Sequence, residues 1–119
     1  MLEIKTTIKN IQEDIRAGYF TEAEKKISRL ALFLTGQIKK KKLSGAQLDQ
    51  VSDWFFILFE TQLEKKIFSA EIENLLYHCF NLHTFINKKD YQKDKKFWEE
   101  VKRIENLAQG LSVVHGCKN

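Results

Sequence analysis

Residues 51–60 read VSDWFFILFE, so an unbroken run of large apolar side chains extends from Trp54 to Phe59 between two acids. An amphipathic surface helix carries such side chains on one face only. A helical wheel assigns the predicted core face to Leu48, Val51, Phe55, Leu58, Phe59 and Gln62. Phe56 and Ile57 fall outside this face, so either another helix of the chain covers them or another molecule does.

Acidic residues lie opposite the predicted core face of the same helix. Asp49, Asp53, Glu60 and Glu64 are spaced by 4, 7 and 4 residues, which places them in one stripe with Phe56 and Ile57 on either side. An apolar patch bordered by carboxylates is typical of a partner groove or a dimer surface. A helix packed between other helices would instead bury the same two side chains, and the sequence leaves both interpretations open.

Helical periodicity extends over most of the chain, which contains no proline and five glycines. Five segments are expected: residue 4 to Gly18, Thr21 to about residue 42, the segment that starts at Ser44, Ser69 to Ile86, and Tyr91 to Gly110. Capping boxes are expected at Thr21 with Glu24 and at Ser44 with Gln47. We therefore predict an all-α fold, a single compact bundle or stack of about five antiparallel helices formed by residues 1–110, with residues 111–119 as a short C-terminal tail. The helices that follow Ser44 and Ser69 are expected to supply most of the core.

The segment AGYFTEAEKKI, residues 17–27, resembles the turn between the two helices of a tetratricopeptide repeat. Gly18, Phe20, Ala23 and Ile27 match the glycine, aromatic, small and large apolar positions of that turn. The resemblance implies stacked helical hairpins with a surface that binds peptides or proteins.

The sequence lacks the motifs that several functional classes require. No glycine-rich phosphate loop, nucleophile with a base, or Glu-x-x-His pair is present, so we expect neither an enzyme nor a cofactor or small-molecule substrate. No apolar run approaches the roughly 20 residues of a membrane span, and the N-terminal segment is charged where a signal peptide is apolar. The two cysteines do not form a disulfide framework, and a reducing compartment suits them, so we expect a cytoplasmic location.

Charge is distributed unevenly around the net value of +4. Residues 1–43 carry ten Lys/Arg against five Asp/Glu, residues 44–87 carry two against six, and residues 88–119 carry eight against five. The alternative function is therefore a basic accessory protein that binds nucleic acid. Its binding residues would be Lys39, Lys40, Lys41, Lys42, Lys88, Lys89, Lys93 and Lys96. The scarcity of arginine and the presence of Asp90 and Asp94 within the second group argue for a solvated surface instead.

Two cysteines and two histidines raise the question of a zinc site. Cys79 and His83 are one helical turn apart, and His115 and Cys117 follow in the tail. Because the first two belong to the expected core stripe of their helix, we favour packing without a metal.

The main functional prediction is a non-enzymatic protein-binding or regulatory module. Its acid-bordered aromatic surface, on the helices that follow Ser44 and Ser69, would hold a protein partner or a second copy in a homodimer. The predicted binding residues are Asp53, Phe56, Ile57, Glu60, Tyr77 and Phe85. A small helical immunity or inhibitor protein is a further alternative of the same size and class.

Overall fold

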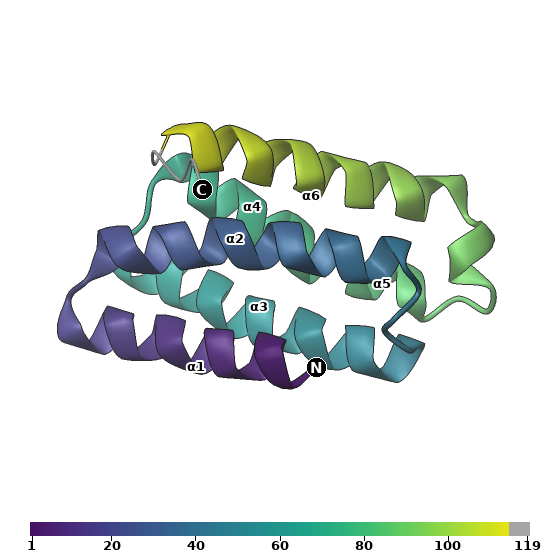
Figure 1. Ribbon diagram of the computed structural model, residues 1–119, viewed down its shortest axis with the longest axis horizontal. Coiled ribbons are helices and arrows are strands. Elements are labelled where there is room, and N and C mark those ends of the chain that lie inside the picture. Colours follow the sequence, from purple (N-terminus) through teal and green to yellow (C-terminus); the bar gives the residue numbers. More distant parts are fainter. Residues whose placement is uncertain (115–119) are drawn as a thin grey trace.

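The fold is all-α, as predicted, in the computed structural model, which describes residues 1–114 and the side chains of residues 1–111 (Figure 1). Five longer helices in this part of the chain are joined by short turns, with a four-residue helix and one turn of 3-10 helix between the last two. Their bounds are α1 Leu2–Ala17, α2 Phe20–Lys39, α3 Gly45–Lys65, α4 Ala70–Asn81, α5 His83–Ile86, η1 Tyr91–Lys93 and α6 Lys95–Val114. None of the helices within residues 1–114 combines the length and apolarity needed to cross a bilayer.

Local sequence signals account for several of the helix ends. Gly18 ends α1 in the left-handed conformation, with φ 82°, which costs a glycine little. The Ser44–Gln47 capping box forms at the start of α3, and the Ser69 hydroxyl accepts a hydrogen bond from the Ile72 amide at the start of α4.

The predicted capping box at Thr21 is wrong. Helix α2 begins one residue earlier, at Phe20, and has no side-chain cap. The carboxylate of Glu24 accepts a hydrogen bond from the backbone N–H of Ser69, 2.8 Å away. That contact joins the α1–α2 hairpin to the turn before α4, and this long-range bond is a use of Glu24 that a local motif does not reveal.

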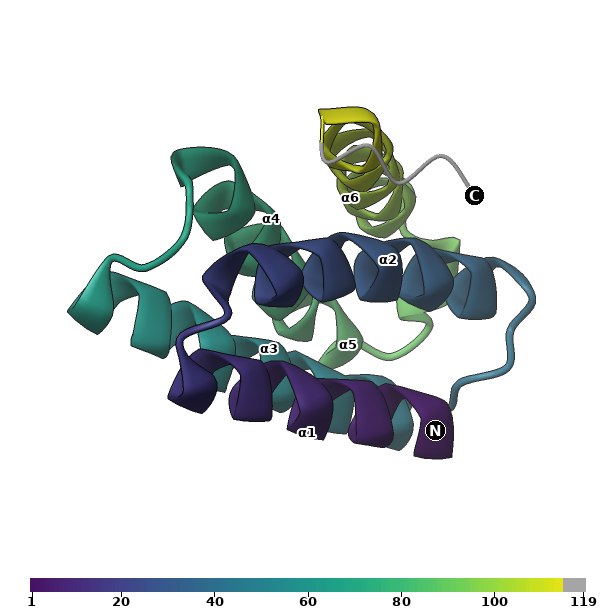
Figure 2. The same ribbon diagram turned by 60° about the vertical axis from the view of Figure 1, so that its left-hand side comes forward.

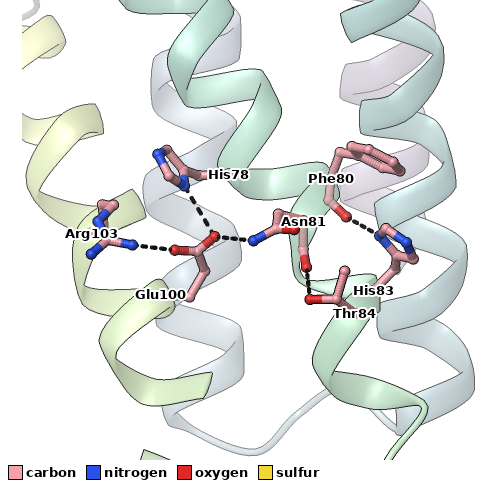
Figure 3. Close-up of polar contacts among 7 residues, drawn as sticks. All are labelled: His78, Phe80, Asn81, His83, Thr84, Glu100 and Arg103. Carbon is pink, nitrogen blue, oxygen red and sulfur yellow. Dashed lines mark hydrogen bonds and ion pairs between the residues drawn. The ribbon is translucent and has the colours of Figure 1, made fainter. Parts of the chain in front are cut away.

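The last two predicted segments also differ in their ends. The helix predicted from Ser69 to Ile86 is interrupted at Leu82. There the Thr84 hydroxyl donates to the Asn81 carbonyl, and the His83 ring donates to the Phe80 carbonyl (Figure 3). Such side-chain bonds take up carbonyls at a helix end. Helix α6 starts at Lys95 and continues through Gly110 to Val114, so the expected end at Gly110 is wrong. Leu111 extends the buried seam of α6 by one step and is only 6% exposed, which outweighs the low helix propensity of one glycine.

Helix α2 occupies the middle of the molecule and contacts α1, α4 and α6 (Figures 1 and 2). Helices α1 and α3 lie along one side of it, and α6 lies along the other, with α4 between α3 and α6. The buried apolar side chains of α2 are Ala23, Ile27, Leu30, Ala31, Leu34 and Ile38. The expectation that α3 and α4 supply most of the core is therefore wrong, because every long helix contributes and α2 is central.

Candidate partner-binding site

The two unexplained residues of the opening run have different surroundings. Phe55 and Leu58 are buried, as the wheel predicts. The ring of Phe56 is partly covered by Phe80 of α4, with ring centroids 4.6 Å apart. Ile57 is 46% exposed, so nearly half of its surface is open to solvent. Another helix of the same chain thus accounts for Phe56 in part and leaves Ile57 at the surface.

Aromatic rings form a continuous row along the junction of α3 with α4 and α5. This aromatic seam consists of Phe56, Phe59, Tyr77, Phe80 and His83. Phe80 lies in its middle, 6.2 Å from Phe59 and 4.6 Å from His83 between ring centroids, and both pairs are stacked. All five residues keep some solvent exposure, and Tyr77 is 42% exposed. The seam therefore holds the helices together and also presents ring edges to solvent.

The surface of α3 next to the seam is apolar and acidic. Leu63, like Ile57, is 46% exposed. The acidic stripe is Asp49, Asp53, Glu60 and Glu64, all exposed and none in an ion pair within the described chain. Some acids outside the stripe are paired, as Asp14 is with Lys26 at 2.6 Å. No ion pair within the described residues therefore competes with an outside partner for this stripe.

The opposite edge of α4 faces α6 across a groove of about 370 Å³. Its lining residues are Tyr77, His78, Asn81, Phe85, Lys96, Glu99, Glu100 and Arg103. One of these residues, Glu100, is only 3% exposed, and Figure 3 shows its carboxylate among His78, Asn81 and Arg103. Buried carboxylates are rare unless they are paired.

Three side chains from two helices satisfy Glu100. Its Oε2 accepts hydrogen bonds from His78 Nδ1 at 3.0 Å and from Asn81 Nδ2 at 2.8 Å, and its Oε1 accepts one from Arg103 at 2.8 Å (Figure 3). Burial alone raises the pKa of Glu100, but the bonds from Asn81, His78 and Arg103 outweigh it and hold the pKa below its ordinary value. An ionised carboxylate therefore ties α6 to the end of α4.

The residues predicted for partner binding divide between these two edges of α4. Asp53, Phe56, Ile57 and Glu60 belong to α3 and its side of the seam. Phe85 packs its ring against Phe97, with centroids 6.2 Å apart, and lines the α4–α6 groove. Tyr77 joins the two surfaces, because its ring contacts Phe59 and also lines the groove.

Sequence reasoning missed Phe80, the centre of the seam, and Glu100, the centre of the polar cluster. Phe80 follows the core residue Cys79 and precedes the helix break, so periodicity alone assigns it no face. Glu100 lies three residues after Phe97 and four before Ile104, both fully buried. An acid at that spacing on a core seam was the available signal for a buried carboxylate.

Of the four residues considered as zinc ligands, the structure describes Cys79 and His83. Cys79 is fully buried, and burial raises the pKa of its thiol. His83 donates from Nδ1 to the Phe80 carbonyl at 2.8 Å and stacks on the Phe80 ring. No group of three metal-binding side chains occurs within residues 1–111, and His115 and Cys117 lie outside the described residues.

The predicted nucleic-acid residues extend from the end of α2 into the α2–α3 turn, and from the segment between α5 and α6 into the start of α6. Lys39 forms an ion pair with Glu105 of α6, and Lys88 lies 4.0 Å from Asp94. The other predicted lysines are exposed and form no ion pair in the described chain: Lys40, Lys41, Lys42, Lys89, Lys93 and Lys96.

No protein-family model matches the chain, and no curated protein sequence or solved structure is significantly similar to it. The resemblance of residues 17–27 to a tetratricopeptide turn stays a prediction. Function is therefore inferred from the geometry described above.

Proposed function

We propose that the protein is a non-enzymatic binding module that holds a basic amphipathic helix of a protein partner along α3, beside the aromatic seam. The observation that carries the proposal is the coincidence of exposed apolar side chains with unpaired carboxylates on one helix face. Ile57 and Leu63 supply apolar contact area, and Asp53 and Glu60 supply the charge.

The exposed edges of the seam suit the contact residues of an interface. Tyr77 offers a ring with little conformational freedom to lose and a hydroxyl that can bond a partner, as interface tyrosines commonly do. Its ring is held by Phe59 and His78, with centroids at 5.9 and 5.2 Å. A side chain already held in position costs less entropy on binding, so the surface is preorganised.

The charge of the stripe selects the kind of partner. Four carboxylates on one face repel an acidic segment and attract a lysine- or arginine-rich one. Successive acids of the stripe are separated by one or two helical turns, a spacing that a helix lying along α3 can match with its own i, i+4 and i+7 positions. A basic amphipathic helix meets both the charge and the apolar requirement.

Site-specific photocrosslinking tests this proposal. A photoreactive amino acid at position 57 should crosslink a lysine- or arginine-rich helical segment in an extract of the host cell, identified by mass spectrometry. The same group at Glu13, an exposed acid on α1, is the matched control and should not capture that segment. Crosslinks from position 57 to a second copy of this chain, or to an acidic segment, would contradict the proposal.

Charge reversal provides the second arm of the test. Asp53→Lys with Glu60→Lys should abolish capture of the crosslinked partner, because both carboxylates are exposed and become repulsive. Glu13→Lys should leave capture unchanged. Since none of these carboxylates has a partner in the described chain, circular dichroism should show the same helix content in all variants.

A further inference from the structure

The two lysine-rich segments, nearly fifty residues apart in the sequence, meet at one end of the helical bundle. The turn between α2 and α3 carries Lys40, Lys41 and Lys42, and the turn between α5 and α6 lies beside it (Figures 1 and 2). A Cβ atom on Gly45, at the start of α3, would lie 3.6 Å from the ring of Tyr91 in η1. This contact places the two turns against each other.

Positive charge dominates this end of the molecule. Residues 39–42 and 88–96 together hold nine lysines and two aspartates. Seven of these lysines form no ion pair within the described chain and are exposed; this basic end consists of Lys40, Lys41, Lys42, Lys89, Lys93, Lys95 and Lys96.

Two of the nearby acids are already paired, while Asp49 and Glu99, each about one turn into its helix, form no ion pair within the described residues. Asp94 is paired with Lys88, and Glu3 lies 3.6 Å from the N-terminal amino group. Only Asp90 of the two turns remains without an ion-pair partner in the described chain. The basic end therefore still carries a net positive charge.

We infer that the basic end is one continuous site for the phosphate backbone of double-stranded nucleic acid. Lysine is a flexible point charge that contacts phosphates well, whereas bidentate reading of bases favours arginine. The segment 39–44 and the segment 87–96 expose no large apolar side chain, because Leu43 is buried and Tyr91 packs on Phe97.

These features favour nucleic acid over a protein partner or a membrane surface. Protein interfaces are depleted in lysine and enriched in aromatic residues, and the basic end has the opposite character. Amphipathic segments that bind membranes insert apolar side chains, which these two segments do not expose. Contacts confined to phosphates predict binding that depends strongly on salt and does not depend on base sequence.

Salt-titrated binding to labelled duplex DNA tests the inference. With seven phosphate contacts, the logarithm of the binding constant should fall against the logarithm of salt concentration with a slope of about −6 between roughly 50 and 200 mM salt. Two duplexes of unrelated sequence should give the same constants within about threefold, since phosphates carry no sequence information. Absence of binding, or a clear preference for one duplex, would overturn the inference.

Neutralising either turn separates one joint site from two unrelated lysine groups. The first variant is Lys40→Gln, Lys41→Asn and Lys42→Gln, with asparagine at position 41 because its φ of 56° is left-handed. The second is Lys89→Gln, Lys93→Gln and Lys95→Gln. Each should reduce the magnitude of the slope by about 2.7, at about 0.9 per lost contact, and weaken binding more than tenfold at about 50 mM salt.

The matched control removes the same charge from other parts of the molecule. Lys9→Gln, Lys65→Gln and Lys66→Asn again includes one left-handed position, with φ 54°, and two of the three lie at the opposite end of α3. This control should keep the wild-type slope. An equal loss in the control, or a loss in only one of the two variants, would overturn the single joint site. Binding to phosphatidylserine vesicles without binding to DNA would assign the basic end to a membrane and overturn it as well.

Discussion

The two edges of α4 are sealed by different physical means. Its edge toward α3 and α5 is closed by the rings of the aromatic seam, with Phe80 in the middle. Its edge toward α6 is closed by the buried carboxylate of Glu100 and the three donors around it. Ring contacts tolerate small shifts and leave edges exposed, whereas a buried carboxylate requires each donor in place. The polar edge is thus suited to fixing the helices, and the aromatic edge to presenting a surface.

The largest expected loss of stability comes from a substitution that disrupts the polar edge. Glu100→Ala removes the acceptor for His78, Asn81 and Arg103 and leaves the first two, which are partly buried, without this partner. We expect the free energy of unfolding to fall by about 2–3 kcal/mol, as for other buried charged hydrogen-bond networks. Chemical denaturation followed by circular dichroism measures this change.

Glu99→Ala is the matched control for that experiment. Glu99 is the exposed neighbour of Glu100 on the same helix and forms no ion pair in the described chain. Its substitution should alter the free energy of unfolding by less than about 0.5 kcal/mol. Equal losses in both variants would mean that Glu100 does not act as a tie between the helices.

The next largest loss of stability is expected from a substitution that disrupts the aromatic edge. Phe80→Ala removes the ring that contacts Phe56, Phe59 and His83. Because Phe80 is only partly buried, we expect a loss of about 2 kcal/mol, less than a fully buried phenylalanine costs. Tyr77→Phe keeps the ring and removes only the hydroxyl, so its stability should stay within about 0.5 kcal/mol of wild type. A Tyr77→Phe loss as large as that of Phe80→Ala would show that the rings are not what closes this edge.

The contributions of the two edges to stability should differ in their dependence on pH. The folded-state pKa of Glu100 is lowered from its ordinary value of 4.5, so its carboxylate stabilises the fold above pH 4.5. That contribution is lost as the pH falls below 4.5 and through the lowered folded-state pKa. The difference in unfolding free energy between wild type and Glu100→Gln should therefore shrink below pH 4.5. The difference between wild type and Phe80→Ala should stay constant over the same range, and parallel pH curves for the two variants would contradict the assignment.

Periodicity predicted the fold class because each of the five longer helices carries apolar residues that recur every three or four positions. The wheel also placed Phe55 and Leu58 correctly in the core. It had no means to decide about Phe56, because the cover comes from Phe80, twenty-four residues further along the chain. The same limit explains Gly110, where burial of Leu111 outweighs a local stop signal, and Glu24, whose carboxylate binds a distant backbone group. Local patterns predict elements, and contacts between elements decide which surface remains open.

The smallest expected effect concerns the residues that raised the first question. Phe56→Ala removes a ring held by Phe80 and should lower the free energy of unfolding by about 1–2 kcal/mol, since Phe56 is partly buried. Ile57→Ala removes a side chain that is 46% exposed and introduces a better helix former, so its cost should stay below about 0.5 kcal/mol. Paired denaturation curves measure both changes. An Ile57→Ala cost equal to that of Phe56→Ala would mean that Ile57 is structurally required. Ile57 would then no longer count as an apolar contact for a partner beside the acidic stripe of α3.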